Sequence, residues 1–141
     1  MMEDNMNLRS LFEESLKNHQ KLVDVLVDAQ DENGISRLSQ SEMARRVDHS
    51  QTWVSQAIRR INAEDVCIEK ISAGVYRVHY SNLAAQGVFS KILNLMIDCY
   101  CDFSVFQKKD REIAEEWDLK LRTVQMFRAY LLTYWKREQD S

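Results

Sequence analysis

The chain has 141 residues, of which 45% are hydrophobic and 29% charged, and its formal net charge is −3. It has no proline and only three glycines, which argues against an all-β sandwich or barrel and favours a mainly helical protein of one or two small domains. No apolar run approaches the ~18 residues of a membrane span, and the acidic N-terminus is unlike a signal peptide. The three cysteines lack the spacing of a disulfide framework. We therefore expect a cytoplasmic protein with reduced cysteines.

Charge is unevenly distributed along the chain. Residues 1–35 carry −5 and residues 81–107 carry −1, whereas residues 36–80 carry +2 and residues 108–141 carry +1. Two mildly basic segments separated by acidic ones suit a protein that contacts phosphate with selected faces, although a solvated helix surface has a similar composition.

The first element is predicted over about residues 7–30, where apolar side chains recur every three or four positions and line one face of a helix. The sequence Asp31–Gly34 should end it, because Gly34 can adopt the left-handed conformation. The length of this helix leaves open a break near Asn18. His19 lies on the apolar stripe, where a lone histidine is expected to pack rather than to bind a ligand.

Two shorter helices are predicted next. Ser39 and Glu42 form a capping box, in which the serine accepts from a helical N–H and the glutamate reaches back to the cap. A helix over residues 40–47 follows, then an interruption that ends at a second cap, Ser50, and then a helix over residues 51–63. The side chains expected to point inward are Met43, Ala44, Val47, Val54, Ile58 and Ile61.

The pattern then changes to period two. Residues 66–71 and 75–80 alternate as β-strands do and are joined by a short turn that contains Gly74, which predicts a hairpin. With this order of helices and hairpin, residues 39–80 resemble the winged helix-turn-helix of MarR-type and related bacterial regulators. Ala44 stands where the two helices of that motif cross, and Asp48 stands where glycine is usual. The resemblance implies a DNA-binding domain whose second helix enters the major groove.

The helix beginning at Gln51 carries polar side chains opposite its apolar side. Glutamine can form two hydrogen bonds with adenine and arginine two with guanine, and a helix N-terminus offers N–H groups to phosphate. The alternative is that these residues are only the solvated side of an amphipathic helix, and Trp53 lies either on a sugar or against the neighbouring helix. The predicted DNA-binding residues are Ser50, Gln51, Thr52, Ser55, Gln56, Arg59, Arg60, Arg45, Arg46 and, from the wing, Arg77.

A second helical region follows. An apolar-rich helix is predicted over residues 83–101, and residues 108–128 resemble the helix-turn-helix of LuxR-type regulators and of sigma-factor region 4. Ala114 and Val124 repeat the spacing of the matching residues in the first motif. The alternative is one uninterrupted helix over residues 110–137 that pairs with a second subunit. If a second motif forms, its predicted DNA-binding residues are Lys120, Arg122, Thr123, Gln125, Met126 and Arg128.

Enzyme chemistry is not expected. No cysteine lies near a histidine in a catalytic sequence context, and there is neither a glycine-rich phosphate loop nor a His-Glu-x-x-His motif. Cys99 and Cys101 are interpreted as core residues rather than as half of a metal site. We therefore expect no catalytic residue, metal or cofactor.

Together these patterns predict a mainly α protein. Residues 1–80 should form a winged helix-turn-helix domain with its N-terminal helix, and residues 81–141 a helical unit that is either a second helix-turn-helix or a pair of dimerisation helices. The expected function is sequence-specific binding of double-stranded DNA by a bacterial, plasmid or phage regulator of transcription, replication or DNA transfer. Its partners would be DNA and either a second copy or an internal pseudo-dimer, with no membrane. The alternative, which the net acidity favours, is an adaptor that binds proteins through a winged-helix scaffold.

Overall fold

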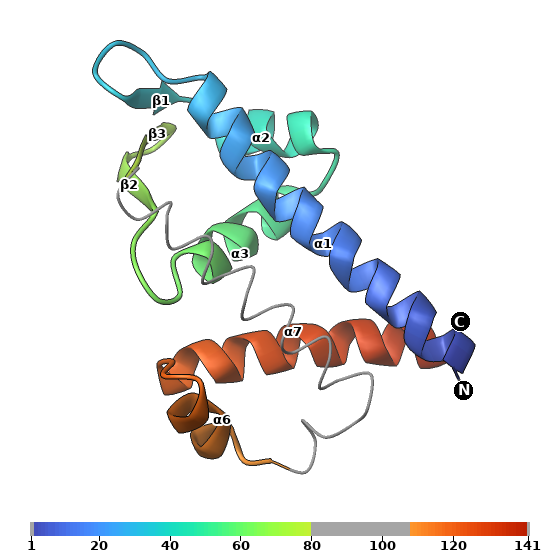
Figure 1. The fold of residues 1–141 in the computed structure, drawn as a ribbon. Helices are drawn as coiled ribbons and strands as arrows, with labels where there is room; N and C mark the ends of the chain where they lie inside the picture. The colour runs from blue at the N-terminus through green and yellow to red at the C-terminus, as the bar shows by residue number, and fades with distance from the viewer. Residues whose placement is uncertain (1, 80–107, 141) are drawn as a thin grey trace. The chain divides into compact units, whose positions relative to one another are not determined.

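The computed structural model describes residues 2–79 and 108–140, which form five helices and a three-stranded antiparallel sheet (Figure 1). The chain is therefore mainly helical, as predicted. The elements are α1 (Met2–Asp28), β1 (Ile35–Arg37), α2 (Gln40–Val47), α3 (Gln51–Ile61), β2 (Ile68–Ser72), β3 (Val75–Val78), α6 (Asp110–Glu116) and α7 (Leu121–Asp140). They belong to two compact units, a first of residues 17–88 and a second of residues 1–16 with 89–141. The helix predicted over residues 83–101 lies outside the described residues.

Helix α1 is continuous, so the break considered near Asn18 does not occur. In the first unit its apolar stripe buries Leu22 and Leu26 completely. A turn follows in which the Asp31 carboxylate accepts hydrogen bonds from the N–H groups of Ile35 (3.0 Å) and Asn33 (2.8 Å). These two bonds, the Ile35 bond first, hold the pKa of Asp31 below its ordinary value.

Strand β1 was not predicted from the sequence. It pairs with β3, which also pairs with β2, so the sheet order is β1-β3-β2 and all pairs are antiparallel. The strand is attached to α1 by the Ser36 hydroxyl, which donates to the Leu26 carbonyl at 2.6 Å. A strand of three residues gives almost no alternation to detect, so its partner strand rather than its own sequence defines it.

Helices α2 and α3 begin at the two predicted caps. The Ser39 hydroxyl accepts from the Glu42 N–H at 3.1 Å, and the Ser50 hydroxyl accepts from the Trp53 N–H at 3.0 Å. Between the helices Asp48 has a φ of +60°, a left-handed conformation that aspartate tolerates better than most residues. The inward prediction is confirmed for Met43, Ala44, Val47, Val54 and Ile61, which are buried, while Ile58 is partly buried against the same core.

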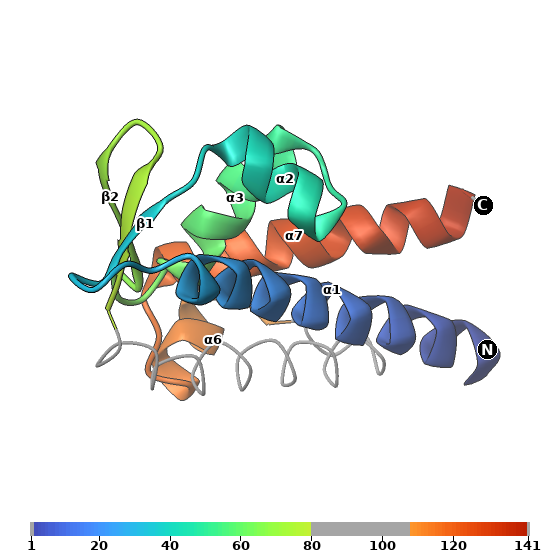
Figure 2. The same cartoon turned by 90° about the horizontal axis from the view of Figure 1, so that it is seen from above.

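The predicted hairpin is present but shorter than expected (Figure 2). Its alternation was predicted to begin at Val66, but Val66 is exposed while Cys67 and Ile68 are both buried. The cause is Asn62, whose side-chain oxygen accepts from the N–H groups of Cys67 and Ile68, both at 2.9 Å. At the other end Gly74 turns the chain with a φ of +72°.

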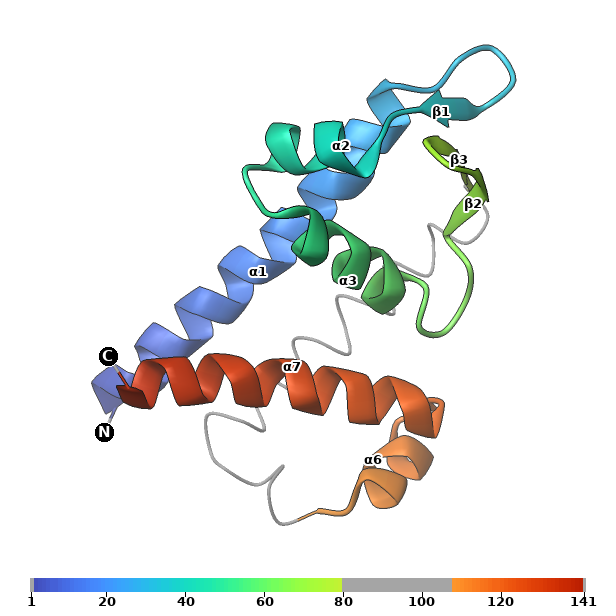
Figure 3. The same ribbon diagram turned by 180° about the vertical axis from the view of Figure 1, so that it is seen from behind.

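Residues 110–137 do not form one uninterrupted helix, so that part of the alternative is wrong. Helix α6 ends at Glu116 and α7 begins at Leu121 (Figure 3). Between them Asp118 has a φ of +52°. A left-handed residue cannot continue a right-handed helix, and the chain therefore turns without needing a glycine or a proline.

The turn between α6 and α7 repeats the turn between α2 and α3 seventy residues later. The N–H of Leu119 donates to the Ala114 carbonyl at 2.9 Å, and the N–H of His49 donates to the Ala44 carbonyl at 3.0 Å. Both turns also place an aspartate in the left-handed conformation. The matching pairs are Ala44 and Ala114, Asp48 and Asp118, His49 and Leu119, and Val54 and Val124.

The left-handed turn residue gives a test of this local structure. We expect Asp48→Gly to keep or raise the free energy of unfolding and Asp48→Val to lower it by about 1–2 kcal/mol, because a β-branched side chain is strained at positive φ. Urea unfolding followed by circular dichroism measures both. Asp65 is the matched control, since it is exposed and its φ is not positive. Equal losses for valine at positions 48 and 65 would contradict the assigned turn.

Candidate functional site

The exposed face of α3 is the strongest candidate site. The helix buries Val54 and Ala57 completely, and its other side is open to solvent. Because each residue is rotated by about 100° from the one before it, residues three or four apart share a side of the helix, and the residues between them face the other side. Six of the predicted site residues are exposed along this helix and its cap, namely Ser50, Gln51, Thr52, Ser55, Gln56 and Arg59.

Arg45 and Arg46 are exposed at the end of α2, but both contact an anion of the same helix. The Nε atoms of Arg45 and Arg46 donate to the Glu42 carboxylate at 2.9 Å and 3.0 Å, and a second Arg45 nitrogen donates to it as well. These bonds, those of Arg45 first, lower the pKa of Glu42 to about 2. The Glu42 side chain thus pairs with the arginines, whereas the capping box predicted that it would reach back to Ser39. An incoming phosphate would compete with Glu42 for both guanidinium groups.

The hairpin adds two cations. Arg77 is exposed on β3, as expected of a wing residue. Lys70 is exposed on β2 and was not among the predicted site residues, since the alternation had placed it on the side of Ile68. The register slips between Lys70 and Ser72, and this irregularity breaks the regular alternation near the tip of the hairpin.

Arg60 does not belong to the exposed face, contrary to the prediction. Only 6% of the residue is exposed, and its Nε donates to Nε2 of the buried His19 at 2.9 Å. The reason is periodicity, since Arg60 lies three residues after Ala57 and so faces the same side. His19 is a packed side chain, as expected, and its Nε2 accepts the hydrogen bond from Arg60.

Trp53 packs inside the motif. It is half-buried, and its ring stacks on that of His49 with centroids 4.0 Å apart and planes 11° apart. The Trp53 ring also contacts the ring of His19, and the centroids of these two rings are 5.1 Å apart. Of the two positions considered for Trp53, the structure supports packing, and the stack holds the turn residue His49 against the first turns of α3.

The second unit presents only part of its predicted site. Lys120, Arg122 and Gln125 are exposed, but Thr123 is fully buried beside Val124. Arg128 donates to the Asp110 carboxylate at 2.9 Å and to the Lys108 carbonyl at 3.0 Å. Thr123 is therefore excluded from any exposed face, Arg128 is held within its own unit, and Met126 is half-buried.

Other kinds of site find little support among the described residues. Residues 2–79 and 108–140 contain no group of three or more histidine, cysteine or acidic side chains that could hold a metal. Within the same ranges, no helix combines the length and apolar character required to cross a membrane. Burial raises the pKa of the Cys67 thiol, which keeps it protonated. Comparisons with protein-family models, curated proteins and solved structures found no match, so the residues themselves carry the functional argument.

Two neighbouring arginines test the assignment of buried and exposed sides. We expect Arg60→Ala to lower the free energy of unfolding by about 2 kcal/mol, because it removes a buried charged donor and leaves His19 without that bond. Arg59→Ala, on the exposed side, should change it by less than about 0.5 kcal/mol. Chemical denaturation of the two variants measures this difference, and equal losses would contradict the orientation of α3.

Proposed function

We propose that the protein binds duplex DNA with a winged helix-turn-helix formed by residues 19–79, and that α3 enters the major groove. The element order α1-β1-α2-α3-β2-β3 and the pairing of β1 with the hairpin support this fold. The observation that carries the proposal is the composition of the exposed side of α3, which is polar along its whole length and ends in an arginine.

Base recognition would come from the middle of α3. Gln56 and Arg59 are exposed three residues apart, so they project from the same side of the helix. An arginine can bond both acceptors of guanine and a glutamine both groups of adenine in the major groove. Ser50, Gln51 and Thr52 lie at the first turn, where side chains and N–H groups can bond the phosphate backbone.

The charge of this surface supports contact with phosphate. Between residues 40 and 79 five cations and two anions are exposed, and three further anions are partly exposed, although the chain as a whole is acidic. The cations are Arg59, Lys70 and Arg77, together with Arg45 and Arg46, which pair with Glu42. They come from α2, α3 and both strands of the hairpin, which suits a duplex contacted by a recognition helix and a wing.

The class of protein that fits this proposal is a sequence-specific regulator of transcription, replication or DNA transfer. Titration of salt against binding to mixed genomic duplex fragments tests it first. Micromolar or tighter binding that weakens steeply with salt supports the proposal. The absence of binding at low salt would leave the adaptor function instead.

Substitutions on α3 test which residues read the site. With a duplex selected from random sequence, Gln56→Ala or Arg59→Ala should weaken binding by about 5- to 150-fold, which corresponds to the loss of one bidentate base contact. Fluorescence anisotropy measures the dissociation constants. Lys21→Ala is the control, because Lys21 is an exposed cation on α1. Unchanged affinity in both α3 variants would remove this face as the reading surface.

Glu42 tests the part played by Arg45 and Arg46. Glu42→Gln removes the charge that holds both arginines, so binding to mixed duplex DNA should tighten and the slope of log Kd against log salt should steepen by about 1. Glu32→Gln, an equal change of charge at an exposed position outside α2, is the control. Equal tightening in both variants would indicate a general charge effect and not a contact made by Arg45 and Arg46.

A further inference from the structure

The helix pair α6–α7 buries side chains at the same positions as the pair α2–α3, but its exposed side chains are different. Val124 and Phe127 are fully buried on α7, as Val54 and Ala57 are on α3. The exposed positions differ in kind. Arg45 and Arg46 correspond to Glu115 and Glu116, Gln51 corresponds to Leu121, and the buried Val47 corresponds to the exposed Trp117.

The charge of this outer face is balanced. Between residues 108 and 129 four cations and four anions are exposed. They are Lys109, Arg111, Lys120, Arg122, Glu112, Glu115, Glu116 and Asp118, of which Glu116 already pairs with Lys108 at 2.9 Å. A phosphate backbone laid across this face would meet as many anions as cations, so the face lacks the cationic excess that DNA binding requires.

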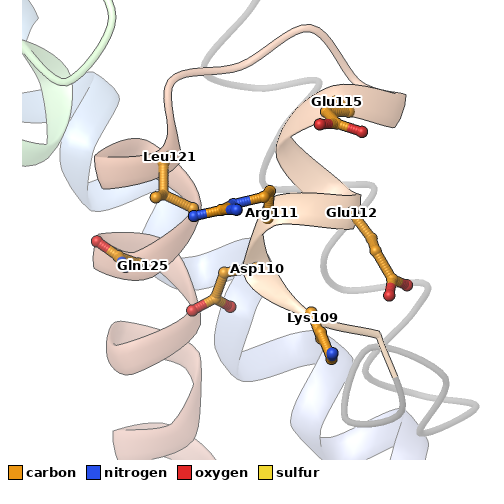
Figure 4. Close-up of a pocket in the computed structure, with 7 residues that line it drawn as sticks. All are labelled: Lys109, Asp110, Arg111, Glu112, Glu115, Leu121 and Gln125. Carbon is orange, nitrogen blue, oxygen red and sulfur yellow. The ribbon is translucent and has the colours of Figure 1, made fainter.

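The same face exposes two large apolar side chains at the turn. Trp117 is 36% exposed and Leu121 is 39% exposed, four residues apart in sequence. Leu121 also lines a hollow of about 470 Å³ between α6 and α7, whose wall includes Lys109, Glu115 and Gln125 (Figure 4). In Figure 4 the side chain of Arg111 reaches from α6 toward Leu121, the one apolar residue that lines the hollow, and the other lining residues include charges of both signs. Exposed aromatic and aliphatic anchors within a charged rim are typical of protein interfaces.

We propose that this α6–α7 face, formed by residues 109–125, binds a second copy of the chain. A two-fold axis brings the same patch of each copy together, so a stable pair requires a patch that complements itself. The hollow beside Leu121 meets this requirement, because its exposed charges are two cations, Lys109 and Arg111, and two anions, Glu112 and Glu115. Each copy therefore offers partners to both kinds of charge in the other. A purely basic or purely acidic partner would leave half of these charges facing like charges. The inference does not depend on DNA binding by α3.

The first test removes the apolar anchors. Sedimentation equilibrium of the full chain at concentrations up to about 100 µM should show a monomer–dimer equilibrium. Trp117→Glu and Leu121→Glu should each raise the dimer dissociation constant at least about tenfold. Val66→Glu is the control, since Val66 is 51% exposed in the other unit, and it should leave the dimer unchanged. Circular dichroism confirms that each variant is folded.

The second test reverses the charges. One variant carries Lys109→Glu with Arg111→Glu, and the other carries Glu112→Lys with Glu115→Lys. Each alone should be monomeric, whereas an equimolar mixture should form a heterodimer with a dissociation constant near that of the wild-type dimer. If the mixture associates, the loss of dimer in each separate variant cannot be due to misfolding, because misfolded chains would not regain binding when mixed.

Three outcomes would overturn the proposal. They are a wild-type chain that stays monomeric, a dimer that none of these substitutions weakens, and a mixture that does not associate. A monomeric chain in which Arg122→Ala weakens DNA binding would assign the face to DNA. Because sedimentation is measured without DNA, its result is independent of the outcome for α3.

Discussion

Val54 and Ala57 share one core with Leu22 and Leu26 of α1, and this burial fixes which side chains α3 can offer to a partner. Once these residues face inward, the helical rotation carries Gln56 and Arg59 to solvent and turns Arg60 toward His19. A large side chain at Ala57, which is fully buried, would not fit this core without displacing α3, and the polar side would lose its fixed direction. The candidate site is thus a consequence of packing on the opposite side of the same helix.

Electrostatics refine what packing exposes. Exposed arginines differ in how readily they can bind a phosphate. Arg45 and Arg46 already contact Glu42, whereas Arg59 has no anion three or four residues away within α3. In the second unit, Arg128 of α7 is held by Asp110 of α6, which is distant from it in sequence. Cation counts along the sequence therefore overstate the positive surface, because helical neighbours three and four residues apart neutralise one another.

The two helical pairs show how one backbone plan can carry different surfaces. Both pairs have a small buried residue, Ala44 or Ala114, and an aspartate in the left-handed turn that follows it. The outer positions are not constrained by this geometry, so one pair presents glutamine and arginine while the other presents tryptophan, leucine and paired charges. We infer different partners for the two faces from their side chains and not from the backbone they share.

Local sequence determined the caps at Ser39 and Ser50, the buried stripe of α2 and α3, and the hairpin turn at Gly74, because each depends on residues within a few positions of one another. It also identified all five exposed residues of α3, which are Gln51, Thr52, Ser55, Gln56 and Arg59. Strand β1, the burial of Arg60 and the exposure of Val66 were decided by partners distant in sequence or by a side chain that breaks the local period. The three-residue strand β1 is defined only by its hydrogen bonds to β3. Arg60 can be buried because His19 accepts a hydrogen bond from it. Such pairings form when the chain folds back on itself, and no periodicity along the sequence records them.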